Sequence, residues 1–586
     1  SGTVSDGSGP LPGAIIVVKG TTRSVATDPE GNYAIAATAG DTLVFSFTGF
    51  KTVEIIVGSQ STVNISLEED ALQLEEVTIN AGYYNVTKKE STGSIARVTA
   101  TEIQNQPVTN VLAAVQGRMA GVSITQNSGT PGGGYTIRIR GTNSLRADGN
   151  APLYIIDGVP ISEQNASTLA GAVLPGGAIN PLNAINPNDI ESIEVLRDAD
   201  ATAIYGSRGG NGVVLITTKR GKAGKTSFSV NSSYGISSVA SHMEMMDTRQ
   251  YLAMRRSAFA HDNITTLPEY AYDVNGTWSQ ERDTDWQKEL IGRTANSSSL
   301  QLSINGGSEN TGFIVSGSHN EQTTVFSDDF KYRTSNLSTN IRHHSADNKF
   351  RMNLSGLFAA QSNNVVNDDF TRQALYLSPN APQLYTQDGA LNWEDNTFTN
   401  PVAAFESKYS YESKGFNTNF NLSYELLPAL QVKLNGGLNH LSFSEKSLRP
   451  STMYNPAYGL TSANSMAFKG TQNRFSYLLE PQLQYDLGIG DHDIEFLIGS
   501  TYQQTTSDVL NAEGYGFQSN ALLSNLSAAT TQVVSQDSRT EYKYAAVFGR
   551  VNYKFRQKYI LNITGRRDGS SRFGPENRFA NFGAVG

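Results

Sequence analysis

The strongest constraint on the fold of this chain is a repeating pattern of apolar and polar residues in residues 221–586. Stretches of about ten residues, in which apolar and polar side chains alternate, recur to the end of this region. Such alternation is typical of a β-strand with one apolar face. Eleven stretches show it, near residues 227–235, 298–305, 312–319, 335–342, 349–358, 416–425, 429–438, 474–486, 493–501, 543–555 and 558–566.

The connections between these stretches alternate in length. The short ones are 306–310, 345–348, 426–429, 488–493 and 556–558. The long ones are 236–297, 359–415, 439–473 and 502–542, with a shorter member at 320–334. Outer-membrane barrels have short periplasmic turns and long outer loops, and their lipid-facing side chains are apolar. This repeating pattern therefore predicts an antiparallel transmembrane β-barrel over residues 221–586, and the alternative is a large soluble β protein.

The first 220 residues have a different texture. Residues 1–69 hold five short apolar runs between turn signals, which predicts a small β-sandwich. The runs are 14–18, 33–37, 42–47, 53–57 and 63–67. Residues 70–84 form a linker that is acidic at its start. Residues 85–220 are predicted to be an α+β domain, with a helix from about 110 to 116 that ends at Gly117. Its strands are expected at 135–141, 153–158, 190–196 and 212–218, so the whole chain is predicted to be mostly β.

Composition excludes several classes of protein. The chain has no cysteine and a net charge of -9, so thiolate metal sites are absent and general nucleic-acid binding is disfavoured. No apolar run approaches the roughly 20 residues of a membrane-spanning helix. The histidines lack the spacing of a zinc site, and no nucleophile elbow occurs. We therefore predict no catalytic residues, no metal and no cofactor, and we do not expect an enzyme.

The glycine cluster GSRGGNG at 206–212 resembles a phosphate-binding loop at first sight. A dinucleotide fingerprint follows a strand and opens a helix. Here a helical segment at about 199–205 precedes the glycines and an apolar strand follows them. Gly206 is predicted to be a helix C-cap, and the cluster is predicted to turn the chain from helix to strand.

Several segments resemble one known family, the SusC/RagA-type TonB-dependent outer-membrane transporters, in the same order along the whole chain. Residues 2–35 resemble its carboxypeptidase-regulatory-like extension, and LEEVTINAGYY (74–84) stands where the family has its TonB box. Four segments resemble the plug domain of this family: VLAAVQGRMAGVSI (111–124), IRIRGTNSL (137–145), PLYIIDGVP (152–160) and residues 190–222. Two segments resemble parts of the family's barrel: DTDWQKELIGRTA (283–295) and LNITGRRDGSSRFGPENRFANF (561–582).

The resemblance implies import of a glycan or peptide across the outer membrane, driven by TonB and assisted by a SusD-like lipoprotein lid. The plug and N-terminal domain would lie on the periplasmic side. TonB would bind Glu76, Val77, Thr78, Ile79 and Asn80, where the β-prone run could add to a partner as an edge strand; a plain linker strand is the alternative. The rival functions are a signalling receptor and a non-transporting assembly protein.

Two further expectations concern the loops and the strand number. Trp278, Trp286 and Trp393 fall in predicted outer loops, where Trp278 and Trp393 could contact the substrate or the lid, the alternative being packing within the loops. A twelfth strand is expected from about Phe579, giving 11–12 of the 22 strands that the family implies. Because an open edge is not tolerated in lipid, further strands or a partner such as the barrel-assembly machinery would have to cover it.

Overall fold

The computed structural model describes the chain except residues 7–8, 22, 48–49, 59, 69–77, 88, 105, 107, 109, 128, 162–180 and 365–367. The chain divides into two compact units, Ser1–Thr78 and Ile79–Gly586. Each unit is described by itself.

The first unit is built from two small sheets around an apolar core. One sheet has the order β4 (Asn32–Tyr33), β1 (Gly2–Ser5), β7 (Ile65–Ser66), and the other β3 (Ser24–Ala26), β2 (Ile15–Val18), β5 (Thr42–Ser46), β6 (Val53–Ile56). Ile16 and Phe45 are fully buried between them. The predicted strands at 33–37 and 63–67 are longer than the observed ones, because their alternation continues past the last ladder pairs.

The second unit begins with a mixed domain that contains a five-stranded sheet. Its order is β10 (Ile95–Thr99), β15 (Ile190–Leu196), β16 (Val213–Thr218), β13 (Leu153–Ile156), β14 (Val159–Ile161). Two hairpins accompany it, β8 (Thr78–Asn80) with β9 (Asn85–Thr87) and β11 (Val122–Gln126) with β12 (Tyr135–Ile139). The strands β9, β10, β11 and β14 were not predicted from the sequence, whereas β8 overlaps the β-prone run of the linker.

Within its described residues the mixed domain has three short α-helices: α1 (Ala100–Gln104), α2 (Val111–Val115) and α4 (Ala199–Thr202). The predicted helix is α2, and its N-cap is Asn110, whose side-chain oxygen accepts a hydrogen bond from the Leu112 amide at 2.7 Å. The buried face of α2, with Val111, Leu112 and Val115, joins the core beneath the sheet.

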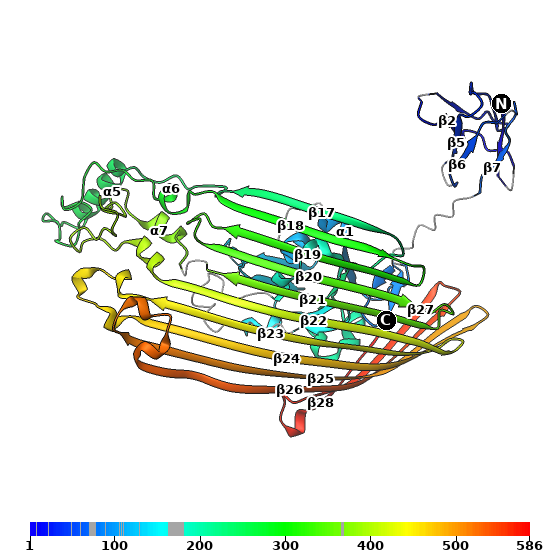
Figure 1. Cartoon of the computed structure of the whole chain (residues 1–586). Coiled ribbons are helices and arrows are strands. Elements are labelled where there is room, and N and C mark those ends of the chain that lie inside the picture. The colour runs from blue at the N-terminus through cyan, green and yellow to red at the C-terminus, as the bar shows by residue number, and fades with distance from the viewer. Residues whose placement is uncertain are drawn as a thin grey trace. The chain divides into compact units, whose positions relative to one another are not determined.

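The rest of the second unit is one antiparallel sheet of 12 strands. They are β17 (Gly224–Ser237), β18 (Ala295–Gly307), β19 (Thr311–Thr323), β20 (Lys331–His344), β21 (Phe350–Asn363), β22 (Lys408–Leu427), β23 (Leu430–Arg449), β24 (Met466–Ile489), β25 (His492–Phe517), β26 (Ala529–Phe555), β27 (Tyr559–Ser570) and β28 (Phe579–Val585). All eleven predicted strands and the predicted twelfth are present. Each strand pairs with its neighbour in sequence (Figure 1).

Short and long connections alternate along this sheet, as the sequence predicts. Residues 428–429 and 490–491 are tight turns at one end, whereas 238–294 and 364–407 are long loops at the other. The long loops carry the helices α5 (Thr248–His261), α6 (Trp286–Ile291) and α7 (Thr371–Tyr376), which lie far from the short turns (Figure 1). We call these the short-turn end and the long-loop end.

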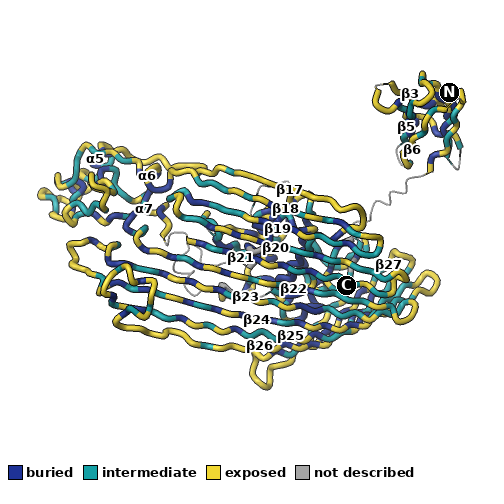
Figure 2. Tube along the Cα trace, viewed as in Figure 1, coloured by how far each residue is buried: buried dark blue, intermediate teal, exposed yellow. Residues whose placement is uncertain are grey.

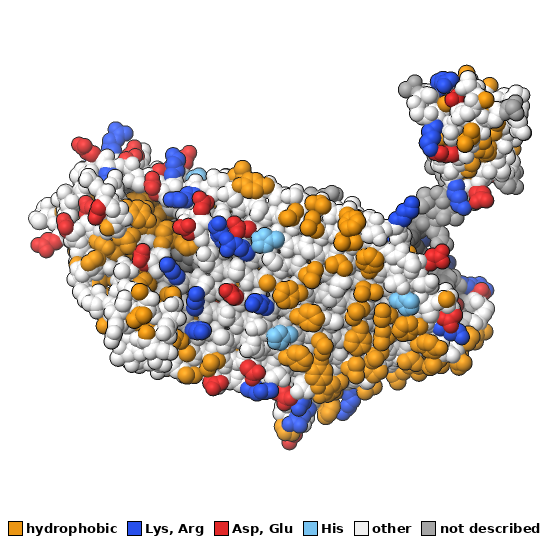
Figure 3. All heavy atoms as spheres, in the orientation of Figure 1, with side chains coloured by type: hydrophobic (Ala, Val, Ile, Leu, Met, Phe, Trp, Pro, Cys, Tyr) orange, Lys and Arg blue, Asp and Glu red, His pale blue; other side chains and the backbone are white. Residues whose placement is uncertain are grey.

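Exposure alternates along the strands (Figure 2). Apolar side chains gather on the outer face over the half of the sheet nearer the short-turn end (Figure 3). On β25, Ile498 and Tyr502 lie in this apolar band, and the same face continues with Asp508. The predicted loops 439–473 and 502–542 are therefore too long, because the strands continue beyond the band and leave only 450–465 and 518–528 as connections.

The sheet has two edges, β17 and β28, and no ladder joins them within the described residues. This agrees with the predicted partial barrel. In the described part of the chain, no helix is both long and apolar enough to cross a membrane.

Candidate functional site

The mixed domain lies against the inward face of the large sheet, and both polar and apolar side chains make the contact. Asn419 on β22 donates to the Ile156 carbonyl at 3.0 Å. Gln301 on β18 and Ser338 on β20 donate to the Asp189 carboxylate at 2.7 Å and 2.9 Å. Burial raises the pKa of Asp189, which lies just before β15. The interface thus combines hydrogen bonds with apolar packing, because Leu357, Leu497 and Phe548 of the large sheet join the buried clusters of the mixed domain.

The segment that follows β8 enters this interface at the short-turn end. The Asn80 side chain donates to the Thr217 hydroxyl on β16 at 3.2 Å and accepts from the Gly82 amide at 2.7 Å. The Ala81 amide donates to the Tyr84 carbonyl at 2.9 Å and closes a tight turn. We call residues 81–84 the tyrosine turn.

Gly82 is required for the tyrosine turn. Its φ is +91°, and a Cβ there would lie 1.6 Å from the Tyr205 hydroxyl. The turn therefore approaches the mixed domain more closely than any residue with a side chain could.

The two tyrosines of this turn contact the large sheet. The Tyr83 hydroxyl donates to Glu480 on β24 at 2.9 Å, and its ring packs between Tyr205 and Phe548 at centroid distances of 5.2 Å and 4.9 Å. The guanidinium of Arg550 on β26 lies 3.4 Å from the centre of the Tyr84 ring. Burial raises the pKa of the Tyr83 hydroxyl, and the nearby Glu480 raises it further, so this hydroxyl remains a donor.

Glu480 begins a chain of buried polar contacts along the large sheet. It is 4% exposed and also accepts from Thr501 on β25 at 2.7 Å. Thr501 in turn accepts from Arg566 on β27 at 3.2 Å, and Arg566 pairs with Asp568 at 2.7 Å. The chain of contacts satisfies each buried charge, as a stable interior site requires.

This chain ends at the glycine cluster. The Ser207 amide and hydroxyl donate to Asp568 at 2.8 Å and 3.0 Å, and Arg566 donates to the Ile204 carbonyl at 2.5 Å. Gly206 lies at φ +59° inside the 3-10 segment Ala203–Gly209 and not at a helix C-cap, because α4 ends earlier and its C-cap is Ala203. The glycine cluster therefore lets the mixed domain bind a carboxylate of the large sheet, besides turning the chain.

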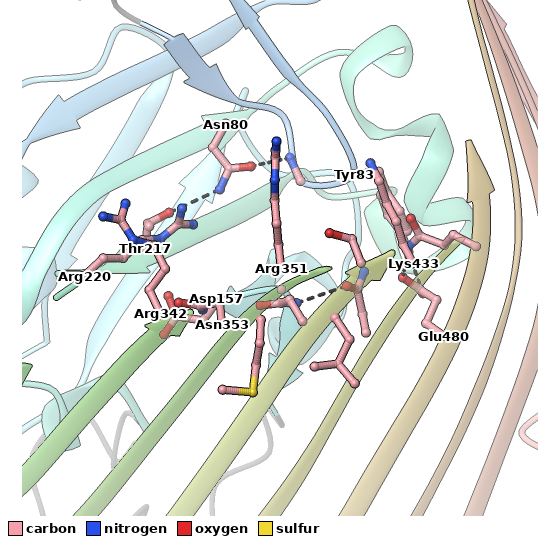
Figure 4. Close-up of a pocket in the computed structure, with 18 of the residues that line it drawn as sticks. Asn80, Tyr83, Asp157, Thr217, Arg220, Arg342, Arg351, Asn353, Lys433 and Glu480 are labelled. Atoms are coloured by element: carbon pink, nitrogen blue, oxygen red, sulfur yellow. Dashed lines mark hydrogen bonds between the residues drawn. The ribbon is translucent and has the colours of Figure 1, made fainter. Parts of the chain in front are cut away.

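A cavity of about 600 Å³ opens beside the tyrosine turn (Figure 4). Asn80, Tyr83 and Glu480 line one part of it, and β20, β21 and β23 supply the inward-facing side chains of the remainder. Four cationic side chains reach it: Arg220, Arg342, Arg351 and Lys433. The carboxylates of Asp157 and Glu480 also line the cavity, so its cationic side chains outnumber its carboxylates by four to two.

A buried carboxylate lies in the sheet below the same segment. Glu194 on β15 is fully buried, and one of its oxygens lies 3.2 Å from the Arg97 Nε on β10. Burial raises the pKa of Glu194 to about 7, although Ser192, Arg97 and the Asn80 backbone act in the opposite direction. The charge of this group therefore changes close to neutral pH.

The predicted TonB-binding residues are only partly described. Glu76 and Val77 lie outside the described residues, and of Thr78 only the backbone is described. Ile79 is buried and Asn80 is bonded to Thr217. TonB binding by these residues stays a prediction.

The three tryptophans lie in the long loops. Trp286 is buried and its indole donates to the Ser378 carbonyl at 2.8 Å. Trp278 is partly buried, donates to Thr397 at 2.9 Å and meets the Phe398 ring edge-on. Packing between loops accounts for these two contacts. Trp393 is half-buried, and contact of Trp278 or Trp393 with a substrate or lid stays a prediction.

Sequence reasoning did not find Tyr83, Glu480, Arg566 or Asp568. Glu480, Arg566 and Asp568 occupy the polar face of alternating strands, where they look like ordinary inward-facing residues. Among the described residues, no group of three or more His, Asp or Glu side chains could hold a metal ion.

Comparisons with known proteins agree with this architecture. A TonB-dependent Receptor Plug Domain model matches residues 87–213, and a CarboxypepD_reg-like domain model matches residues 1–79. The chain is 32% identical to TonB-dependent receptor P3 of Formosa agariphila, over 99% of this chain and 55% of that protein. It is 31% identical to TonB-dependent receptor SusC of Bacteroides thetaiotaomicron, over 99% of this chain and 57% of that protein.

The solved structures of the RagAB peptide importer are similar as well. The 'open-open' state aligns with a TM-score of 0.72 and 26% identity, covering 87% of this chain and 58% of that chain. The 'closed-closed' state gives 0.70 and 26%, covering 84% and 57%. The chain spans about half the length of the curated relatives it matches.

Proposed function

Since this chain is, by sequence and fold, a SusC/RagA-type TonB-dependent receptor with part of an outer-membrane β-barrel, we propose that it takes part in TonB-driven nutrient import. The observation that carries the proposal is the mixed domain itself. It lies against the inward face of the large sheet and contacts it through hydrogen bonds and a few apolar side chains. A domain held in this way can be displaced by a pull on the segment that precedes it.

In the proposed orientation, the short-turn end and the first unit face the periplasm, where TonB would bind residues 76–80. The long loops face outward and meet a SusD-like lipoprotein. Barrels of this class have short periplasmic turns, and the TonB-box-like segment enters the interface at the short-turn end, which together support this orientation. A signalling receptor without import, or a non-transporting assembly protein, is the rival function.

The substrate is proposed to be a peptide or a glycan. The RagAB structures are named as a peptide importer, and polar amide and hydroxyl side chains dominate the inward face, as hydrogen bonding to either substrate class requires. Uptake of labelled mixed oligopeptides and of labelled mixed oligosaccharides, compared between a deletion strain and the complemented strain, would assign the class. No difference in uptake of either mixture would favour a rival function.

The role of TonB is tested by deleting residues 76–80. We expect uptake to stop while the protein still inserts into the outer membrane. A variant with the same five residues in scrambled order is the matched control for linker length, and it should also fail. Normal uptake by the deletion variant would refute the assignment of this segment.

A further inference from the structure

The tyrosine turn fastens the end of the TonB-box-like segment to two surfaces at once. Asn80 bonds to Thr217 of the mixed domain. Only three residues later, Tyr83 bonds to Glu480 of the large sheet, and Tyr84 packs under Arg550. A pull applied before residue 79 therefore loads the Asn80–Thr217 bond first and, three residues later, the bond of Tyr83 to the large sheet.

Glu480 and Arg550, the residues of the large sheet that contact the tyrosine turn, are held in place by other hydrogen bonds. Both oxygens of Glu480 accept hydrogen bonds, from Tyr83 and Thr501 on one and from Gln482 on the other. Arg550 is buried and donates to Asn562 at 2.7 Å and to Glu495 at 2.8 Å. Neither partner can follow the turn if the turn moves away, so movement of the turn must break these contacts.

We propose that Tyr83 is a positioning residue whose hydrogen bond to Glu480 keeps residues 81–84 docked against the large sheet, and that this bond must break before the plug can be displaced. This inference rests on the proposed function for its biological meaning. Its physical content, the fastening of residues 79–84 to the barrel wall, is independent of what is transported. Tyr84 and Arg550 form a second contact that limits how far the turn moves once the Tyr83 bond is broken.

Hydrogen exchange on the whole protein in detergent micelles tests the fastening. Tyr83→Phe removes the hydroxyl and keeps the ring between Tyr205 and Phe548. A hydrogen bond to a charged acceptor contributes enough that its loss should accelerate exchange of amides 79–87 by roughly tenfold or more. Amides of β15 serve as the internal reference and should keep their rates. Equal acceleration of β15 would show only a general loss of structure and would overturn the proposal.

Two further variants make the test specific. Tyr477→Phe removes a tyrosine hydroxyl that donates to Gln504 at 2.9 Å on the outer face of the large sheet, and it should leave amides 79–87 unchanged. Glu480→Gln keeps a neutral acceptor for the Tyr83 hydroxyl and should exchange at a rate between those of the wild type and Tyr83→Phe, whereas Glu480→Ala should exchange at least as fast as Tyr83→Phe. Rates for Tyr83→Phe within twofold of the wild type would refute the proposal.

Binding of the purified C-terminal domain of TonB connects the fastening to function. If the docked segment must detach before it binds, Tyr83→Phe should lower the apparent Kd by the same factor by which it accelerates exchange. An unchanged Kd with faster exchange would separate the fastening from TonB engagement and overturn its proposed role. Absence of TonB binding by the wild type as well would instead contradict the proposed function.

Discussion

Substitution of Gly206 by alanine tests whether the glycine cluster is built to approach Asp568. Gly206 has φ +59° and ψ −136°, a conformation that costs a residue with a side chain about 1–3 kcal/mol. Its added Cβ would lie 2.1 Å from an oxygen of Asp568. The carboxylate must therefore move and weaken its bonds to Ser207, which adds about 1.5–3 kcal/mol for charge-assisted hydrogen bonds.

The two contributions predict that Gly206→Ala destabilises this contact by at least about 2.5 kcal/mol, which is an increase of roughly 70-fold in the opened population. Arg208 lies inside the cluster, so trypsin can report the opening. In brief native-state digestion of the whole protein, the rate of cleavage after Arg208 follows the opened fraction when reclosing is fast. Mass spectrometry of the released peptides measures that rate.

Gly210→Ala is the matched control within the same cluster. Gly210 has helical angles of φ −58° and ψ −30°, and its added Cβ would make only an ordinary contact of 3.6 Å with the Ser207 carbonyl. We expect its cleavage rate to stay near that of the wild type. If Gly206→Ala and Gly210→Ala were cleaved at rates within threefold of each other, the close approach to Asp568 would not explain the glycine.

The remaining predictions concern the mixed domain, the outer face and the loops. Because burial raises the pKa of Glu194 from 4.5 to about 7, the stability of β15 should be greatest below pH 4.5 and fall by about 3 kcal/mol as the pH rises through 7. Hydrogen exchange across this pH range should show the loss of stability in the wild type and not in Glu194→Gln. A flat wild-type profile would contradict the burial argument. Ile498→Arg places a charge in the apolar band and should lower the stability of the barrel by about 2–4 kcal/mol, as measured by refolding into vesicles. Asp508→Arg changes a residue on the same face beyond the band and should be tolerated. Equal effects of the two variants would show that the band does not end between these residues. Trp278→Phe removes the hydrogen bond to Thr397 and should destabilise the loops by about 1 kcal/mol. If packing is the only role of Trp278, uptake should not change. A loss of uptake by Trp278→Phe or Trp393→Phe in a correctly folded protein would support contact with the substrate or the lid.

The sequence predicts the strands because lipid imposes a period of two on their outer face. Leu430, Val432 and Leu434 alternate with polar residues, and β23 begins at Leu430 as expected. The ends of the strands were not predictable, since beyond the apolar band both faces meet water. On β25 the period fades after Tyr502, although the ladder continues to Phe517.

The candidate site was less accessible to sequence reasoning. Tyr83 and Glu480 are separated by 397 residues, and nothing in the local pattern around Glu480 distinguishes it from other inward-facing residues. The glycine cluster gave a usable signal: its order excluded a phosphate loop, but the partner of its amides, Asp568, depends on the register of β27 against the mixed domain. The adjacent Tyr83 and Tyr84, directly after a β-prone segment, were the remaining signal.

The length of the central strands has a consequence for how a partner reaches the loops. β25 runs 15 residues beyond Tyr502, which is about 50 Å along the strand at ~3.4 Å per residue. With a strand tilt of about 40°, the connection 518–528 stands roughly 40 Å above the apolar band. If the proposed lid lipoprotein is anchored by lipid in the outer leaflet, it would need an extended tether of about a dozen residues to rest on these loops, and shortening that tether would prevent it from covering them.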